Sequence, residues 1–269
     1  MELKKKLTNE EVRNIQLEIL DNFINFCSTH NLKYSLTGGS LLGAVRHQGF
    51  IPWDDDIDLM MPRADYEIFV KSFNTDNIKK SIKCFSYENN KTWNLLFSKL
   101  MDTNTILFET TTKGEHENIE MGVFVDVFPI DGCSDNWKKE LQRIKFYNRI
   151  LISHLSIKFN NSIKLFLSSV LKSLFSIEYA QNKANKLLKT YVFGNTKYAG
   201  VIVGVYGEKE IYTYDTFSEY TELLFENRKI MCIKNFDKYL IQHYGNTYME
   251  LPPMEKRIVI FQTAYLKNN

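Results

Sequence analysis

An acidic run that leads directly into an apolar segment restricts the fold of this chain more than any other feature. Residues 54–58 read DDDID, and Leu-Met-Met follows at once. The apolar residues predict a buried strand over 57–61, which Pro62 ends. Because carboxylates are costly to bury without compensation, the acids are expected at an edge of the sheet, within reach of water or a cation.

Asp56 and Asp58 have the spacing of a metal-binding pair. Side chains two residues apart on a strand share a face and lie about 6–7 Å apart, and Asp54 joins that face if the strand extends so far. Without a cation such carboxylates repel, and one is driven to bind a proton. Since Mg²⁺ favours one or two carboxylates together with phosphate oxygens, we expect a magnesium site, with Mn²⁺ as the alternative ion. A solvated acidic turn is the competing interpretation.

A glycine-containing turn lies about fifteen residues before the acids, where residues 37–43 read TGGSLLG. Gly38 and Gly39 let the backbone turn sharply and approach a ligand closely. The start of the following helix offers unpaired N–H groups to an anion, and Ser40 is expected both to cap that helix and to bind a phosphate. The spacing matches neither the Walker A nor the GxGxxG motif, so a plain strand-to-helix turn is the alternative.

Two further charged residues lie inside apolar segments that predict strands. Asp126, within 122–128, is expected to be a metal ligand or general base, with a structural salt bridge as the alternative. Lys99, within 95–101, needs a partner, for which a substrate phosphate or a site carboxylate would serve. Asp131 is expected to form a turn after the strand.

Several other residues are weaker candidates for the same site. Arg46 follows the glycine turn closely enough to bind a diphosphate, a group that suits the arginine fork. Its neighbour His47 has either a functional or a packing role. Trp53 stacks on a base or a choline cation, or belongs to the core. His243 and Tyr244 precede the last loop and are further candidates.

The order of predicted elements indicates a mixed α/β sheet domain with a helical appendage. Thr8 and Glu11 have the spacing of a capping box before a helix of apolar periodicity over 12–27. The remaining predicted elements are strands at 33–37 and 198–206 and helices at 40–46, 65–73 and 235–244, with helical pattern over most of 137–191.

Charge divides the chain into a basic middle and acidic flanks. Residues 136–200 hold twelve Lys and Arg against two acids, a net charge of +10, which leaves −8 for the rest of a chain whose total is +2. We therefore divide the chain into a core at 1–135, a basic helical segment at 136–200 and a C-terminal segment at 201–269. The basic segment is expected to contact an acidic membrane or an anionic lipid-linked glycan, or else is a solvated helical face. The small total charge argues against a nucleic-acid partner.

The compartment indicated by the sequence is the cytoplasm, with peripheral contact at the inner membrane face as an extension. The four cysteines are far apart in sequence and form no zinc pattern, which favours reduced, structural thiols. The first residues are charged and lack the apolar region of a secretory signal. The most apolar stretch, at 163–175, is too short and too charged to cross a bilayer.

The motif at 38–69, GGSLLGAVRHQGFIPWDDDIDLMMPRADYEIF, resembles the signature of the LicD family, which includes bacterial phosphocholine transferases and fukutin-type phosphoribitol transferases. The similarity continues at 122–132 (GVFVDVFPIDG) and at 244–257 (YGNTYMELPPMEKR). It implies a nucleotidyltransferase-like fold related to DNA polymerase beta and dependence on Mg²⁺. It also implies transfer of a phospho-alcohol, phosphocholine first, from a CDP-alcohol donor to a glycan hydroxyl, with release of CMP.

By the same resemblance, Asp56 and Asp58 match the metal-binding pair, the turn at 38–40 matches the phosphate side, and Asp126 matches an acid of the second motif. The implied acceptor is a teichoic acid, lipopolysaccharide or capsule glycan or its lipid-linked precursor. The sequence departs from the pattern at 258–261, where an expected His is missing. Two other functions stay open: nucleotidyl transfer from an NTP, and a non-catalytic role in glycan assembly.

Overall fold

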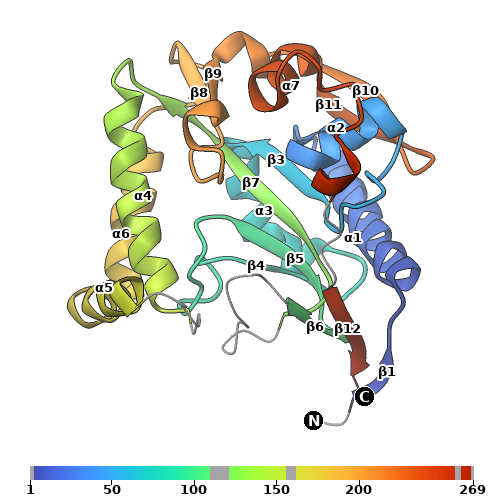
Figure 1. Cartoon of the computed structure of the whole chain (residues 1–269), viewed down its shortest axis with the longest axis horizontal. Helices are drawn as coiled ribbons and strands as arrows, with labels where there is room; N and C mark the ends of the chain where they lie inside the picture. The colour runs from blue at the N-terminus through green and yellow to red at the C-terminus, as the bar shows by residue number, and fades with distance from the viewer. Residues whose placement is uncertain (1–2, 110–120, 156–161, 258–261, 268–269) are drawn as a thin grey trace.

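The computed structural model describes residues 3–109, 121–155, 162–257 and 262–267, so the departure at 258–261 and Lys158 of the basic segment lie outside it. A mixed sheet forms its centre (Figure 1). Strands β3 and β7 run parallel, and their other neighbours are antiparallel. The order is β2 (Ser35–Leu36), β3 (Asp58–Pro62), β7 (Phe124–Cys133), β5 (Ser98–Asp102) and β4 (Ile82–Phe85). The predicted mixed α/β class is confirmed.

Helices α1 (Asn9–Thr29) and α3 (Arg63–Asp76) pack together against the sheet through aromatic side chains. The ring centroids of Phe23 and Phe69 lie 5.3 Å apart at a steep angle, the edge-to-face arrangement that aromatic pairs favour. The capping box of α1 is confirmed, because Thr8 Oγ1 accepts the Glu11 N–H while the Glu11 carboxylate accepts the Thr8 N–H. These two helices give the sheet a rigid support on one face.

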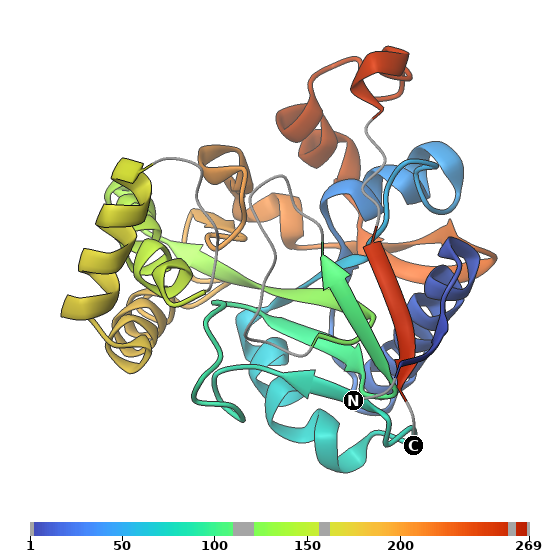
Figure 2. The same ribbon diagram turned by 60° about the horizontal axis from the view of Figure 1, so that its bottom comes forward.

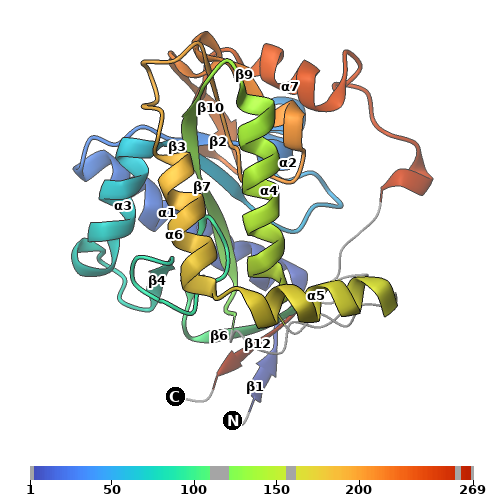
Figure 3. The ribbon, with the colours of Figure 1, turned by 90° about the vertical axis from the view of Figure 1, so that its left-hand side faces the viewer.

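The predicted helical appendage is present and lies beside the sheet (Figures 1 and 3). It consists of α4 (Trp137–Ser153), α5 (Ser162–Leu174) and α6 (Ile177–Leu188). Buried Gln181 of α6 fastens it to the core, donating to the carbonyls of Trp93 and Leu95 at 3.0 and 2.9 Å. Across the described ranges, every helix is too short or too polar to cross a membrane.

The C-terminal third of the chain completes sheets that begin in the first half. β12 (Gln262–Lys267) lies between β1 (Leu3–Lys6) and β6 (Thr105–Glu109), which Figure 2 shows at the front. β8 (Tyr198–Gly200) joins β7 to β9 (Ile211–Thr213). The expected strand at 198–206 is therefore wrong beyond Gly200, because the chain turns where the Gly204 N–H donates to the Val201 carbonyl at 2.9 Å.

A β-hairpin and a short helix finish the fold on the side of the glycine turn. β10 (Tyr220–Phe225) and β11 (Arg228–Ile233) are joined through Glu226 and Asn227, and α7 (Phe236–Tyr244) follows. The Glu226 carboxylate accepts the Phe50 N–H at 3.1 Å, which ties the hairpin to the chain before the acidic run. The four cysteines are free and buried, as expected of structural thiols.

Candidate active site

A cleft of about 700 Å³ opens between the acidic run and the C-terminal third of the chain. One wall carries Asp54, Asp56 and Asp58 beside Gly39 and Arg46. The opposite wall comes from residues far away in sequence, namely Val205, Tyr206, Tyr244 and residues 247–253 other than Met249. Acids, aromatic rings and one arginine therefore face the same space, a combination that suits a charged ligand with an organic part.

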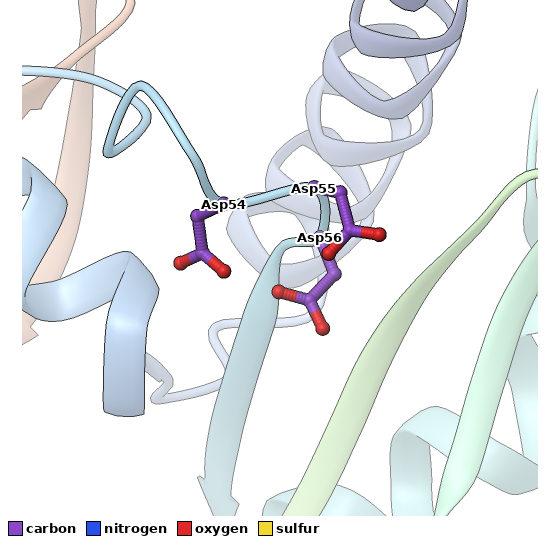
Figure 4. Close-up of side chains that lie close together, drawn as sticks. All are labelled: Asp54, Asp55 and Asp56. Carbon is purple, nitrogen blue, oxygen red and sulfur yellow. The ribbon is translucent and has the colours of Figure 1, made fainter. Parts of the chain in front are cut away.

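The acids at 54–56 lie in a loop, because β3 begins only at Asp58. The expectation that Asp54 and Asp56 share a strand face with Asp58 is therefore wrong for these two residues. The loop instead brings Asp55 together with its neighbours: one carboxylate oxygen from each of the three residues lies within 4.8 Å of the others. Figure 4 shows the three side chains on the same side of the loop.

Helix α1 holds the backbone of this acidic loop. Arg13 Nη2 donates to the carbonyl of Asp54 at 3.0 Å, and Gln16 Nε2 donates to the carbonyl of Asp55 at 2.7 Å. Both hydrogen bonds are made to main-chain carbonyl oxygens and not to the carboxylates. α1 thus fixes the backbone of the loop whose Asp54 and Asp56 side chains line the cleft.

The acids of the site bind protons more readily than ordinary carboxyl groups. Burial, followed by the charges of Asp54, Asp55 and Asp126, raises the pKa of Asp56 well above its usual value. Burial and the charges of Asp56, Asp126 and Asp54 do the same to the pKa of Asp58, while Lys99 opposes both shifts. Crowded carboxylate oxygens fit a hard divalent cation, because the positive charge of the ion would relieve the repulsion between them.

Asp126 lies directly beside Asp58 and Lys99 in the sheet. The register pairs Asp58 of β3 with Asp126 of β7, and Asp126 with Lys99 of β5. Lys99 Nζ lies 2.7 Å from Asp126 Oδ1, both side chains are buried, and the ammonium also lies over the Phe124 ring. Of the two partners expected for Lys99, the structure shows the site carboxylate. The roles of Asp126 as metal ligand or base and of Lys99 as phosphate ligand stay predictions.

The glycine turn packs directly against the acids. Helix α2 (Gly38–His47) begins at Gly38, which has a left-handed φ of 52°. A Cβ on Gly39 would lie 2.4 Å from Asp54 Oδ2, so only glycine fits there without displacing the carboxylate. The N-cap is Thr37 and not Ser40 as expected, because the extended backbone ends one residue before Gly38. Ser40 Oγ instead accepts the Asp58 N–H at 2.9 Å.

Arg46 lines the cleft and also anchors its far wall. Its Nη1 donates to the carbonyls of Tyr248 and Glu250 at 2.7 and 3.1 Å. Trp53 lines the cleft too, with the Arg257 guanidinium 5.1 Å from its ring centroid. An arginine of the chain itself therefore lies over this indole, and the stacking of Trp53 on a base or a choline cation stays a prediction.

Of the C-terminal candidates, Tyr244 lies at the cleft and His243 does not. The ring centroids of Tyr244 and Tyr206 lie 6.2 Å apart, and burial raises the pKa of both phenols. His243 is buried, and its Nδ1 shares a 2.8 Å hydrogen bond with Tyr212 Oη, so it packs inside the fold. Sequence reasoning missed Tyr206, for which no local pattern distinguishes it from a core tyrosine.

Asp131 is not the turn residue that the sequence suggested. It lies within β7, is 1% exposed, and forms a two-bond ion pair with Arg63, each bond 2.6 Å long. β7 continues to Cys133, five residues beyond the expected strand end at 128, because β8 supplies a further partner there. The pair fastens the start of α3 to the sheet on which Asp126 lies.

Comparison with known proteins matches the part of the chain in which this site lies. The family model described as "LicD/FKTN/FKRP, nucleotidyltransferase domain" matches residues 31–162, a range that contains the glycine turn and the acids. The lipopolysaccharide cholinephosphotransferase LicD of Haemophilus influenzae is 31% identical over 268 residues, covering 93% of this chain and 95% of that protein. An uncharacterized protein of Rickettsia typhi is 31% identical over 121 residues, 44% of this chain and 35% of its own length. The chain therefore belongs to the LicD family, and it is a transferase of that family.

Proposed function

We propose that this transferase moves phosphocholine from a CDP-choline donor to a hydroxyl of a cell-surface glycan, or of its lipid-linked precursor, and releases CMP. The observation that carries the proposal is the cluster of carboxylates facing the cleft directly beside the glycine turn. The similarity to a cholinephosphotransferase supports the choice of phosphocholine over the other phospho-alcohols. We also propose that the mixed sheet is a nucleotidyltransferase-like fold, which the description of the matching family supports.

Asp56 and Asp58, with Asp54 and Asp55 beside them, are the proposed ligands of Mg²⁺ or Mn²⁺. When bound, the ion would neutralise negative charge on the donor diphosphate. The all-oxygen donor set and the raised pKa values of Asp56 and Asp58 support this choice of ion. Asp126 is the proposed third carboxylate, and its ion pair fixes it at the level of Asp58.

The remaining residues of the wall would hold the donor. Gly38 and Gly39 place the first N–H groups of α2 next to the acids, where a phosphate oxygen would find donors and the positive end of the helix dipole. Arg46 adds a positive charge at the cleft. The acceptor hydroxyl would attack the phosphorus that bears choline, the bond to the CMP oxygen would break, and a site carboxylate would take the hydroxyl proton.

A donor screen tests this proposal. The protein is incubated with Mg²⁺, a crude glycan acceptor and, in turn, CDP-choline, CDP-ethanolamine, CDP-glycerol, CDP-ribitol or CTP, and CMP and pyrophosphate are measured. We expect CMP from CDP-choline, with labelled choline appearing on the glycan, and no turnover by the Asp56→Asn variant. Pyrophosphate from CTP would indicate nucleotidyl transfer instead. Calorimetry that detects no Mg²⁺-dependent donor binding would indicate a non-catalytic protein.

A further inference from the structure

Helix α5 carries a stripe of exposed apolar side chains. Ile163, Phe166, Leu167 and Leu174 follow one another at helical spacing and are 69%, 67%, 55% and 67% exposed. The C-terminal part of the helix packs back on the core through Leu171. In Figure 3 the N-terminal part of α5 extends beyond α4, and the exposed Ile163, Phe166 and Leu167 belong to this part of the helix. Single exposed apolar residues are normal, but a continuous stripe of this kind marks a contact surface.

A second apolar projection lies at the mouth of the cleft. Met254, in the short helix η3 (Met254–Lys256), is 74% exposed, and Leu251 just before it is 54% exposed. Leu251 also lines the cleft, so this projection forms part of the rim of the site. The two projections belong to separate parts of the chain and share no sequence pattern.

Both projections point to the same side of the molecule. In Figure 3 the N-terminal end of α5 and η3 extend to the right, whereas α3 and β4 lie on the left. In Figure 2, η3 lies at the top of the view, and α5 lies at its left edge and points upward. A flat surface on this side can therefore touch α5 and η3 together, and Leu251 of the cleft lining lies close to η3 in the chain.

We propose that this side of the protein binds an anionic lipid membrane, with the N-terminal half of α5 and η3 inserting their apolar side chains at the headgroup boundary. Charge favours anionic lipid as the occupant. α5 carries Lys164 and Lys172, and α4 beside it carries exposed Arg143 and Arg149. Basic residues next to apolar side chains on a helix are the combination that attracts a protein to anionic headgroups and holds it there.

This proposal rests on the function proposed above, and it adds how the enzyme would meet a lipid-linked acceptor. A glycan acceptor attached to a lipid carrier would project from the membrane directly into the cleft rim formed by Leu251 and its neighbours. The membrane contact would thus raise the local concentration of acceptor without adding any contact to the reacting groups. Membrane binding itself requires neither donor nor acceptor, so it is measured independently of transfer.

Vesicle co-sedimentation tests the proposal with three single variants. Wild-type protein should sediment with vesicles of phosphatidylglycerol and phosphatidylcholine, but not with vesicles of phosphatidylcholine alone. Salt at about 0.5 M should release it, because salt screens the attraction between basic side chains and anionic headgroups. Phe166→Gln and Met254→Gln should each weaken binding about tenfold, since each removes one large apolar side chain from the lipid. Ile78→Gln is the matched control: it is 77% exposed and lies between α3 and β4, on the opposite side. It should bind as wild type does.

Several outcomes would overturn this inference. Wild-type protein that stays in the supernatant with anionic vesicles at low salt would reduce the stripe to a solvated face. Equal binding by wild type and both Gln variants would show that charge alone, in another orientation, attracts the protein. A wild-type dimer that Phe166→Gln converts to a monomer, with no binding to vesicles, would assign the stripe to a second copy of the chain. In each case, a separate assay of CMP release with a detergent-solubilised acceptor tests the proposed transfer without any membrane.

Discussion

Replacing Asp56 by Asn is expected to stabilise the protein when no divalent cation is present. One carboxylate oxygen from each of Asp54, Asp55 and Asp56 lies within 4.8 Å of the other two, so ionised Asp56 is repelled by two neighbours. At that distance each repulsion amounts to about 1 kcal/mol with the dielectric constant of water and to about 3 kcal/mol with an effective value near 20. The wild-type loop relieves part of this repulsion by binding a proton. We therefore expect Asp56→Asn to raise the free energy of unfolding by about 1–3 kcal/mol.

The dependence of this gain on pH follows from the raised pKa of Asp56. A carboxyl group whose pKa is higher in the folded than in the unfolded protein binds more protons when folded. Wild-type stability therefore falls as the pH rises from the ordinary value of 3.8 to the raised folded value. The Asn variant has no proton to lose at this position, so its advantage is small near pH 4 and largest at pH 8.

Urea unfolding in EDTA, at several pH values from 4 to 8, measures the difference between the two proteins. Asp135→Asn is the matched control, because Asp135 is exposed and lies outside the acidic loop. It should change the free energy of unfolding by less than about 0.5 kcal/mol at every pH. With millimolar Mg²⁺ the order should reverse, since only wild type gains from binding the ion. A destabilised Asp56→Asn protein in EDTA at pH 8 would refute the electrostatic reasoning.

Three further substitutions test other parts of the site. Asp126→Asn should lower the rate of CMP release by about 10²-fold or more, the scale of general acid–base catalysis, and near-normal turnover would leave Asp126 a structural role. Gly39→Ala should disable transfer with little loss of the folded state, because its Cβ would displace the Asp54 carboxylate; unchanged Mg²⁺ binding in calorimetry would contradict this. Arg63→Met should cost about 3–5 kcal/mol in urea unfolding by leaving Asp131 buried without its partner, and a loss below about 1 kcal/mol would show that water replaces the guanidinium.

The parts of the fold that local sequence patterns specify were predictable. α1 was recognised from its capping box and apolar period, and β3 from the Leu-Met-Met run, because both signals lie within a few residues. The hairpin of β10 and β11 was missed, since its turn uses Glu226 and Asn227, both with positive φ, in place of the usual Asn-Gly. β1 reads LKKK and has no strand pattern of its own; its pairing with β12 comes from the distant end of the chain.

In the candidate site too, residues that belong to short motifs could be predicted, whereas residues brought in from distant parts of the chain could not. The sequence indicated the turn at Gly38 and the acids at Asp56 and Asp58, because each motif is short and chemically specific. The shared strand face that it offered for Asp54, on condition that the strand extended so far, is not formed, because β3 begins only at Asp58. Residues whose roles depend on packing, such as Tyr206 on the far wall, have no signature that a single sequence could reveal.

The hydrogen bonds of Arg46 to the carbonyls of Tyr248 and Glu250 join positions 202 and 204 residues apart. Thr37, directly before the glycine turn, is likewise joined to Tyr239 across 202 residues. During synthesis, which proceeds from the N-terminus, the acidic loop and its supporting helix emerge from the ribosome long before the wall that faces them. A nascent chain therefore has no closed cleft until residues 239–253 have left the exit tunnel, and a stalled or truncated product would present the carboxylates without the wall that faces them.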